Sequence, residues 1–285
     1  MNRLLMIGLA VLVLAAATSA TKAFNQKDLD RVLAGKSCRK CDLSNADLRN
    51  ADLKGRKLDG TNLSGADLRG ANLKQIMWRR ANLGNANLSG AQLRRAQLKG
   101  VNLTGTNLSN ADLREAKLKG QNLEGVNLKG ANLSGAQLQK ANLKGVDLTG
   151  ANLSYAHLNS ADLTGANLTK TEMQRTSLQG VNLTKANLTE ANLMSPFLDK
   201  STKLPGANLS GATLTDIYLR TNNLEGANLS GATLKEITLE AVNLKGANLR
   251  NAKLPNSNLM KGVKLSGATW PDGRKCAKGS IDICK

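Results

Sequence analysis

A leucine recurs at every fifth position through most of this chain. From Leu43 to Leu198, thirty-two positions are spaced by five, and all are leucine except Trp78 and Met173. A period of five matches neither the helical period of 3.6 nor the strand period of 2. Aromatic residues make up only 2% of the sequence, so leucine and alanine supply nearly all of the core. Such a strict period indicates a repeat array, in which one small unit is copied and stacked.

Each pentad combines a very short strand with a corner. Alanine most often stands two positions before the central leucine, as in Ala46 and Ala66, and asparagine or aspartate stands between them. Side chains two apart in a strand share a face, so the alanine and the leucine point one way and the polar residue points the other. The remaining two residues commonly end in glycine or asparagine, which favour turns with positive φ.

The pentads resemble the pentapeptide-repeat family, whose consensus A(D/N)LXX appears as ADLRG at 66–70, ANLSG at 131–135 and ANLTK at 166–170. The resemblance covers residues 38–270. It implies an all-β fold, a right-handed quadrilateral β-helix with four pentads per coil and the leucine and alanine side chains inside. At a spacing of about 4.8 Å per coil, the rod is expected to be about 55 Å long.

Two single-residue slips interrupt the array, one between Leu198 and Leu204 and one between Leu259 and Leu265. The first predicts a bulge at residues 199–203. In phase after the second slip, Trp270 is expected at a central position.

Two polar residues, Arg56 and Gln121, occupy positions that normally point inward. An unpaired polar group is costly in the core. We therefore expect both residues at distorted corners rather than buried.

The first 23 residues are typical of a secretory signal peptide. Arg3 precedes an apolar run over residues 4–17, and small residues follow, with Ala20 and Ala23 both suited to cleavage. The run is shorter than the roughly 20 residues that a membrane span needs. The sequence thus predicts an exported protein, either periplasmic or secreted, or a protein of an equivalent lumen.

A short helix is predicted ahead of the array. The stretch NQKDLDRVLAG spaces Leu29, Val32 and Leu33 along one helical face, with Asn25 as its cap and Gly35 as its stop. We expect this helix to cover the open end of the first coil, where strand edges and leucines would otherwise be exposed.

The predicted organisation has six segments: a signal peptide at 1–23, a capping segment at 24–37, repeat coils at 38–198, a bulge at 199–203, repeat coils at 204–270, and a disulfide-stapled tail at 271–285.

The four cysteines lie at the two ends of the array. Cys38 and Cys276 are 238 residues apart, which is about twelve coils or about 55 Å, whereas a disulfide needs Cα atoms within about 7 Å. Within one molecule, only Cys38–Cys41 and Cys276–Cys284 can form. Export favours both as staples. A four-cysteine zinc site would need two molecules meeting end to end, and a redox role for the CxxC pair is a less favoured alternative.

The chain is strongly basic, with a formal net charge of +19. Residues 20 apart stack on one side of such a rod, and two columns of cations result, namely Lys54, Lys74, Arg94 and Arg114, and then Arg79, Lys99 and Lys119. Stacked like charges repel unless an anion offsets them. These seven residues are candidates for binding a polyanion, such as a lipopolysaccharide headgroup, an acidic glycan or a phosphate polymer. The alternative is a solvated basic surface that keeps the rod soluble.

No catalytic constellation is identifiable, and the single histidine, His157, occupies an outward position. The sequence therefore favours a non-enzymatic binding scaffold, without a cofactor, a metal or an identified small-molecule substrate. A protein-binding rod without anion specificity is the main alternative. Less favoured are a thiol–disulfide role of Cys38 and Cys41 and the topoisomerase binding by DNA mimicry that the family resemblance implies, because such mimicry requires an acidic surface. Self-association through Trp270 and the C-terminal coil is possible if the tail leaves the last coil open.

Overall fold

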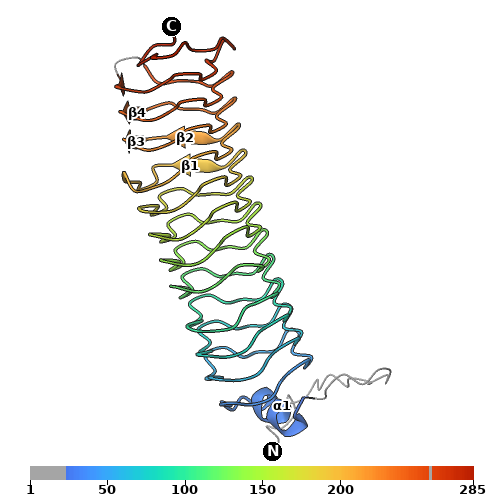
Figure 1. Ribbon diagram of the computed structural model, residues 1–285. Helices are drawn as coiled ribbons and strands as arrows, with labels where there is room; N and C mark the ends of the chain where they lie inside the picture. Colours follow the sequence, from blue (N-terminus) through green and yellow to red (C-terminus); the bar gives the residue numbers. More distant parts are fainter. Residues whose placement is uncertain (1–23, 257–258) are drawn as a thin grey trace, which may run out of the picture.

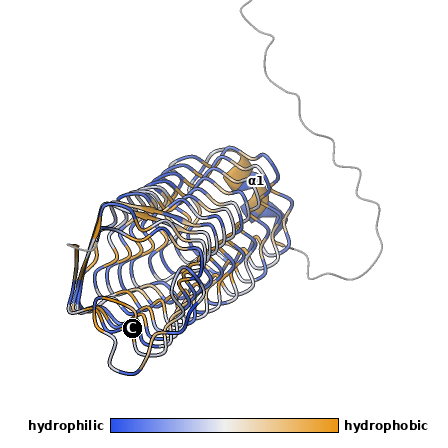
Figure 2. Cartoon of the chain, turned by 90° about the horizontal axis from the view of Figure 1, so that it is seen from above, coloured by the Kyte–Doolittle hydropathy of each residue, from blue (hydrophilic) through white to orange (hydrophobic). Residues whose placement is uncertain are grey.

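The computed structural model describes residues 24–256 and 259–285, which form a single stack of coils (Figure 1). Parallel bridges join each outward residue to the one 20 positions later, as in Asn62↔Asn82, over nearly the whole stack. Four such bridging segments follow one another in each coil. Seen from the C-terminal end, the coils lie one behind another (Figure 2). The predicted repeat of four pentads per coil is therefore present, and the right-handed path remains what the resemblance implies.

Hydrogen bonds between the coils run along the axis of the stack. The N–H of Leu63 donates to the C=O of Asn82 in the next coil at 2.7 Å, and the N–H of Asn82 donates back to the C=O of Thr61 at 2.9 Å. The central leucines, such as Leu63, are completely buried. Each pentad thus satisfies its main chain between coils while its leucine fills the interior.

The corners take left-handed backbone conformations at their second residue. Glycine often stands there, as at Gly65 with φ of 68°, but the same conformation occurs at Asn45, Arg80 and Tyr155 with φ of 55° to 61°. The prediction of positive φ at these corners is confirmed.

Longer strands appear only toward the C-terminus. Strands β1 (Asn192–Met194) and β2 (Thr213–Thr215) pair in parallel, and β3 (Ile217–Arg220), β4 (Ile237–Glu240) and β5 (Met260–Lys261) form a second parallel sheet.

The first slip lies where the sequence predicts it. Ser177 pairs with Phe197 20 residues later, whereas Asn182 pairs with Lys203, 21 residues later. The extra residue is accommodated in the turn before Lys203.

The predicted position of the second slip is wrong. Leu239 pairs with Met260 rather than with Leu259, so the extra residue comes before Met260. Lys253 still pairs 20 residues back with Thr233, which places the slip between Lys253 and Met260. Met260 takes the buried place and Leu259 is half-buried. Sequence spacing alone could not distinguish these cases, because methionine fills a leucine position well.

Helix α1 (Gln26–Leu33) covers the first coil, with the Asn25 side chain capping its N-terminus. The N–H of Asn25 donates to the C=O of Asp42 at 3.0 Å, and the N–H of Asp42 donates to the Asp28 carboxylate at 2.9 Å. Leu29 is buried by this packing.

One detail of the predicted helical face is wrong. Val32 is fully buried, but Leu33 is 56% exposed. Leu33 is the last residue of the helix, and only the preceding apolar positions contact the coil.

The C-terminal tail closes the other end of the stack. It adds antiparallel bridges to the last coil, Lys264↔Ile281 and Thr269↔Lys275. Trp270 is half-buried against the core. The tail thus pairs with two of the four segments of the last coil.

Both ends carry a disulfide. Cys38 is joined to Cys41 and Cys276 to Cys284, with Cα atoms 5.8 and 4.8 Å apart. This is the pairing that the length of the rod leaves available within one molecule.

The expected signal peptide lies outside the described residues. Among those that the structure describes, no helix is long and apolar enough to cross a membrane.

Asparagine ladders on the outer surface predict a measurable stability contribution. Asn228 donates to Asn208 at 2.9 Å, accepts from Asn248 at 3.1 Å, and accepts the N–H of Ser230 at 3.2 Å. Replacing it in Asn228→Ala is expected to lower the free energy of unfolding by about 1–3 kcal/mol.

The matched control is Gln137→Ala, at an outward position that keeps its main-chain bridges but whose side chain forms no hydrogen bond with any described residue. It is expected to change the unfolding free energy by less than about 0.5 kcal/mol. Urea denaturation of both variants measures the difference. Equal losses would show that the amide ladder does not stabilise the stack.

Candidate functional site

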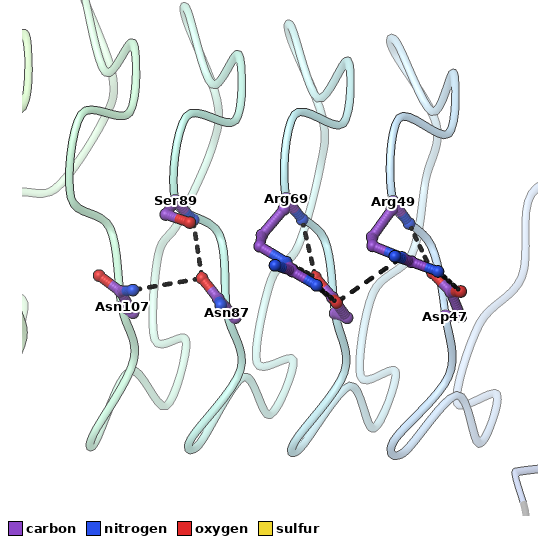
Figure 3. Close-up of polar contacts among 7 residues, drawn as sticks. Asp47, Arg49, Arg69, Asn87, Ser89 and Asn107 are labelled. Carbon is purple, nitrogen blue, oxygen red and sulfur yellow. Dashed lines mark hydrogen bonds and ion pairs between the residues drawn. The ribbon is translucent and has the colours of Figure 1, made fainter.

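The four outer faces of the rod differ in the residue that points outward. On the first face, which begins at Asp42, and on the second, which begins at Asp47, 21 of the 24 bridged residues are asparagine or aspartate. Figure 3 shows the second face, where Asn107 donates to Asn87 at 3.3 Å and the N–H of Ser89 donates to the same oxygen at 3.1 Å. The polar residues of these faces thus hold both the next coil and the following corner.

The fourth face has none of these residues. We define the fourth face by its outward residues. They are Lys57, Met77, Gln97, Lys117, Gln137, His157, Ser177, Phe197, Tyr218 and Thr238. The third face, which begins at Asp52, is intermediate, with six asparagine or aspartate residues among eleven. The fourth face has lost the stabilising pattern along its whole described length. Sequence analysis missed this signal, which becomes visible only when every fourth pentad is aligned.

The seven predicted anion-binding residues flank this face. Lys54, Lys74, Arg94 and Arg114 stand at the corner before it, and Arg79, Lys99 and Lys119 at the corner after it. The structure therefore brings the two predicted columns to opposite edges of one surface. The two columns differ in whether their cations have carboxylate partners.

The column before the fourth face is partly neutralised. Arg94 and Arg95 both bind Glu115, at 2.7 Å each, and Arg114 binds Asp112 at 2.6 Å. The hydrogen bonds from Arg95 and Arg94 lower the pKa of Glu115, and the Arg114 side chain likewise lowers the pKa of Asp112. Two of the four predicted cations of this column thus already have carboxylate partners.

The column after the fourth face lines an open groove of about 1190 Å³. We call it the basic groove. Eight cations line it and only one carboxylate, that of Asp59. None of the eight forms an ion pair with any residue that the structure describes. They are Arg39, Lys40, Arg79, Arg80, Lys99, Lys117, Lys119 and Lys140.

Glycine and long basic residues share the second corner position of the groove. Along the rod this position holds Lys40, Gly60, Arg80, Gly100, Gly120 and Lys140. A Cβ atom at Gly60 would lie 3.4 Å from the Lys40 side chain, and one at Gly100 would lie 3.8 Å from the Arg80 side chain. Both are ordinary contact distances, so glycine is favoured here because it tolerates the positive φ of 68° and 69°.

Trp78 lies in the interior behind the groove. Trp78 replaces a central leucine, and the bond from its N–H to the C=O of Gln97 is 3.1 Å. The next bond along, from Leu98 to Lys117, is 3.3 Å, compared with 2.7 Å from Leu63 to Asn82 on the first face. The reverse bonds of the same bridges, from Gln97 to Ile76 and from Lys117 to Ala96, are both 2.9 Å, so the coils keep their pairing beside the indole.

The prediction for Gln121 is wrong in an informative way. Gln121 is only 5% exposed. The oxygen and nitrogen of its side-chain amide take the place of main-chain groups as hydrogen-bond partners of the preceding coil. Its Nε2 donates to the C=O of Val101 and its Oε1 accepts the N–H of Gly100, both at 2.9 Å. The bridge expected between Asn102 and Asn122 is absent from the described chain. Burial is tolerated because both ends of the amide form hydrogen bonds.

Arg56 also departs from its predicted place. The Arg56 side chain is half-buried. The adjacent bridge Lys57↔Met77 is intact, so the backbone there is not distorted as predicted. The Arg56 guanidinium lies against Gly35 at the N-terminal end. Being in the first coil, the long side chain can reach past the end of the stack.

Among the described residues, one group of potential metal ligands lies at the N-terminal disulfide, namely Asp28, Cys38 and Cys41. Both sulfurs are joined to each other, and the Asp28 carboxylate accepts the N–H of Asp42. This group therefore holds α1 to the first coil.

Family comparisons agree with the repeat architecture. The model described as "Pentapeptide repeats" matches residues 111–150, 147–184 and 223–259, and the model described as "Pentapeptide repeat region" matches residues 37–108. The chain belongs to the pentapeptide-repeat family. No curated protein matches it.

Solved structures of the family resemble the chain to different degrees. HetL, a pentapeptide repeat protein involved in heterocyst differentiation regulation in the cyanobacterium Nostoc sp. strain PCC 7120, is 32% identical, with 89% of this chain and 99% of HetL covered and a TM-score of 0.50. Rfr23 from the cyanobacterium Cyanothece 51142 is 28% identical over 51% of this chain and 97% of its own, with a TM-score of 0.20. QnrB1, a plasmid-mediated fluoroquinolone resistance protein, is 21% identical over 75% and 85%, with a TM-score of 0.21. The role of HetL is a property of HetL and assigns no partner to this chain.

The Gln121 side chain replaces a main-chain bridge between two coils, which predicts faster amide exchange at that point. The Asn122 N–H has no main-chain acceptor in the described chain, whereas the Asn142 N–H donates to the C=O of Gln121 at 2.9 Å. In Gln121→Val, which copies Val101 of the preceding coil, the ladder is expected to close. Amide exchange at Asn122, followed by NMR, should then slow by about tenfold. Asn142 serves as the internal reference. Unchanged exchange at Asn122 would contradict the assigned role of Gln121.

Proposed function

We propose that this protein is an exported, non-catalytic binding rod that holds an anionic polymer along its fourth face. The observation that carries the proposal is the basic groove, in which eight cations face one carboxylate without an ion-pair partner in the described chain. The loss of the asparagine ladder on the same face supports it. Neither the absence of stabilising amide ladders nor the clustering of like charges favours folding, so both are more simply explained by a role in binding.

Electrostatic repulsion supports an anionic partner. Two cations about 5 Å apart repel each other by about 0.8 kcal/mol in a water-like dielectric before screening. Arg79, Lys99 and Lys119 occupy the same corner position on successive coils. A bound polyanion would remove this repulsion and gain several charge-assisted hydrogen bonds.

The shape of the groove supports a polymer rather than a small anion. Its lining runs from Arg39 to Lys140, across about six corner positions, which is about 25 Å at the coil spacing. A single phosphate or carboxylate would contact only two or three of these cations.

Two features support export. Residues 1–23 have the pattern of a signal peptide, and all four cysteines are paired. Disulfides persist mainly in oxidising compartments such as the periplasm and the cell exterior. The proposed site of action is therefore the periplasm, the cell exterior or an equivalent lumen.

DNA mimicry is disfavoured by the sign of the charge, because such mimicry requires an acidic surface. A protein partner without anion specificity is the remaining alternative.

Three substitutions test the groove. Arg79→Ser/Lys99→Ser/Lys119→Ser places serine where this chain already has Ser64 and Ser134 at equivalent corners, so the fold should persist. Binding of fluorescent polyphosphate and of alginate oligomers at about 0.1 M salt is expected to weaken by at least about tenfold, as for the loss of several charge contacts.

A matched control removes the same charge elsewhere. Lys129→Ser/Lys144→Ser/Lys245→Ser changes three exposed corner lysines that lie outside the groove. This variant should retain nearly all of the affinity. Equal weakening of both variants would mean that only net charge matters, and the proposed groove function would then be abandoned.

A further inference from the structure

The C-terminal half of the fourth face carries a second, chemically different surface. Phe197 and Tyr218 are each 55% exposed and occupy the outward position of successive coils. The sequence contains only six phenylalanine, tryptophan and tyrosine residues. Two of them therefore project from neighbouring coils of one face. We call this pair the aromatic step.

The backbone is open at the aromatic step. Ser177 bridges to Phe197 and Tyr218 bridges to Thr238, but no bridge joins Phe197 to Tyr218 in the described chain. The bulge follows directly after Phe197. The N–H of Leu198 and the C=O of Pro196 form no main-chain hydrogen bond with any described residue. Unpaired donors and acceptors thus lie between two exposed rings.

Acidic and hydroxyl groups surround the step. The Tyr218 hydroxyl donates to Glu240, which also binds Arg220 at 3.3 Å. Asp216 accepts a hydrogen bond from Ser195 at 2.7 Å at the neighbouring corner. The hydrogen bond to Glu240 restrains the Tyr218 ring, so less side-chain entropy is lost when a ligand packs on it.

These features identify the chemistry of the ligand. Glu240 is paired with Arg220, so the negative charge beside the Tyr218 ring is balanced and an anionic sugar chain can approach it. A sugar ring presents an apolar C–H face that packs on an aromatic ring, while its hydroxyl groups bond to carboxylates and unpaired backbone groups.

We propose that the aromatic step is a saccharide-binding site, and that the polymer on the fourth face is an acidic polysaccharide. The inference rests on the proposed function of the basic groove. The step lies about three coils beyond Lys140, or about 15 Å, so one linear chain can reach both. Its charged residues occupy the groove, and a sugar ring packs on Phe197 and Tyr218.

The test compares two polyanions on one variant. In Phe197→Ala/Tyr218→Ala, binding of alginate oligomers, a linear carboxylated polysaccharide, is expected to weaken by about tenfold. Binding of polyphosphate, which has no sugar ring, should be unchanged. Leu33→Ala, at a residue exposed to the same degree on α1, is the matched control. Saturation-transfer NMR should also show weaker transfer to the alginate C–H protons in the double variant than in Leu33→Ala.

The outcomes separate this inference from the groove function. If alginate binding survives the double substitution, or polyphosphate binding falls equally, the saccharide site is wrong while the groove can stand. If neither polyanion binds the unaltered protein saturably, the groove function fails, and the polysaccharide inference falls with it.

Discussion

Axial hydrogen bonding between coils is the constraint on which the rest of this structure depends. Because each main-chain segment pairs with the segment 20 residues away, every change in chain length must be absorbed locally or it would turn leucines outward. The two slips are absorbed in this way before Lys203 and before Met260. The same constraint aligns residues 20 apart into columns, so a chemical property can be built up along one face without changing the fold.

The fourth face shows how such a rod can separate stability from binding. The first two faces use asparagine and aspartate to tie coils and corners together. The fourth face lacks this amide ladder, and its main-chain bridge is absent between Phe197 and Tyr218. On the adjoining first face, the Gln121 amide replaces the bridge between Asn102 and Asn122. Stability supplied by three faces leaves the outward positions of the fourth available for other chemistry.

The repeat period, the corner conformations and the helix that starts after Asn25 could be predicted from the sequence, because each follows from local patterns. Both basic columns could also be located, since they depend only on the 20-residue coil. The ion pairs of Arg94 and Arg114 could not, because they depend on side-chain directions. The burial of Gln121 could not be predicted either, because its amide replaces two backbone partners. The pairing of Met260 rather than Leu259 could not be predicted because the two side chains are similarly apolar.

The most direct test of the binding face is lysine footprinting along the intact rod. Acetylation by a water-soluble reagent, read by mass spectrometry, would be compared with and without saturating alginate. The account predicts protection of Lys99, Lys117, Lys119 and Lys140, which line the groove, and none at Lys129, Lys144 and Lys245, which stand at other corners. Uniform protection of both sets, or protection of the second set alone, would contradict a binding site on the fourth face.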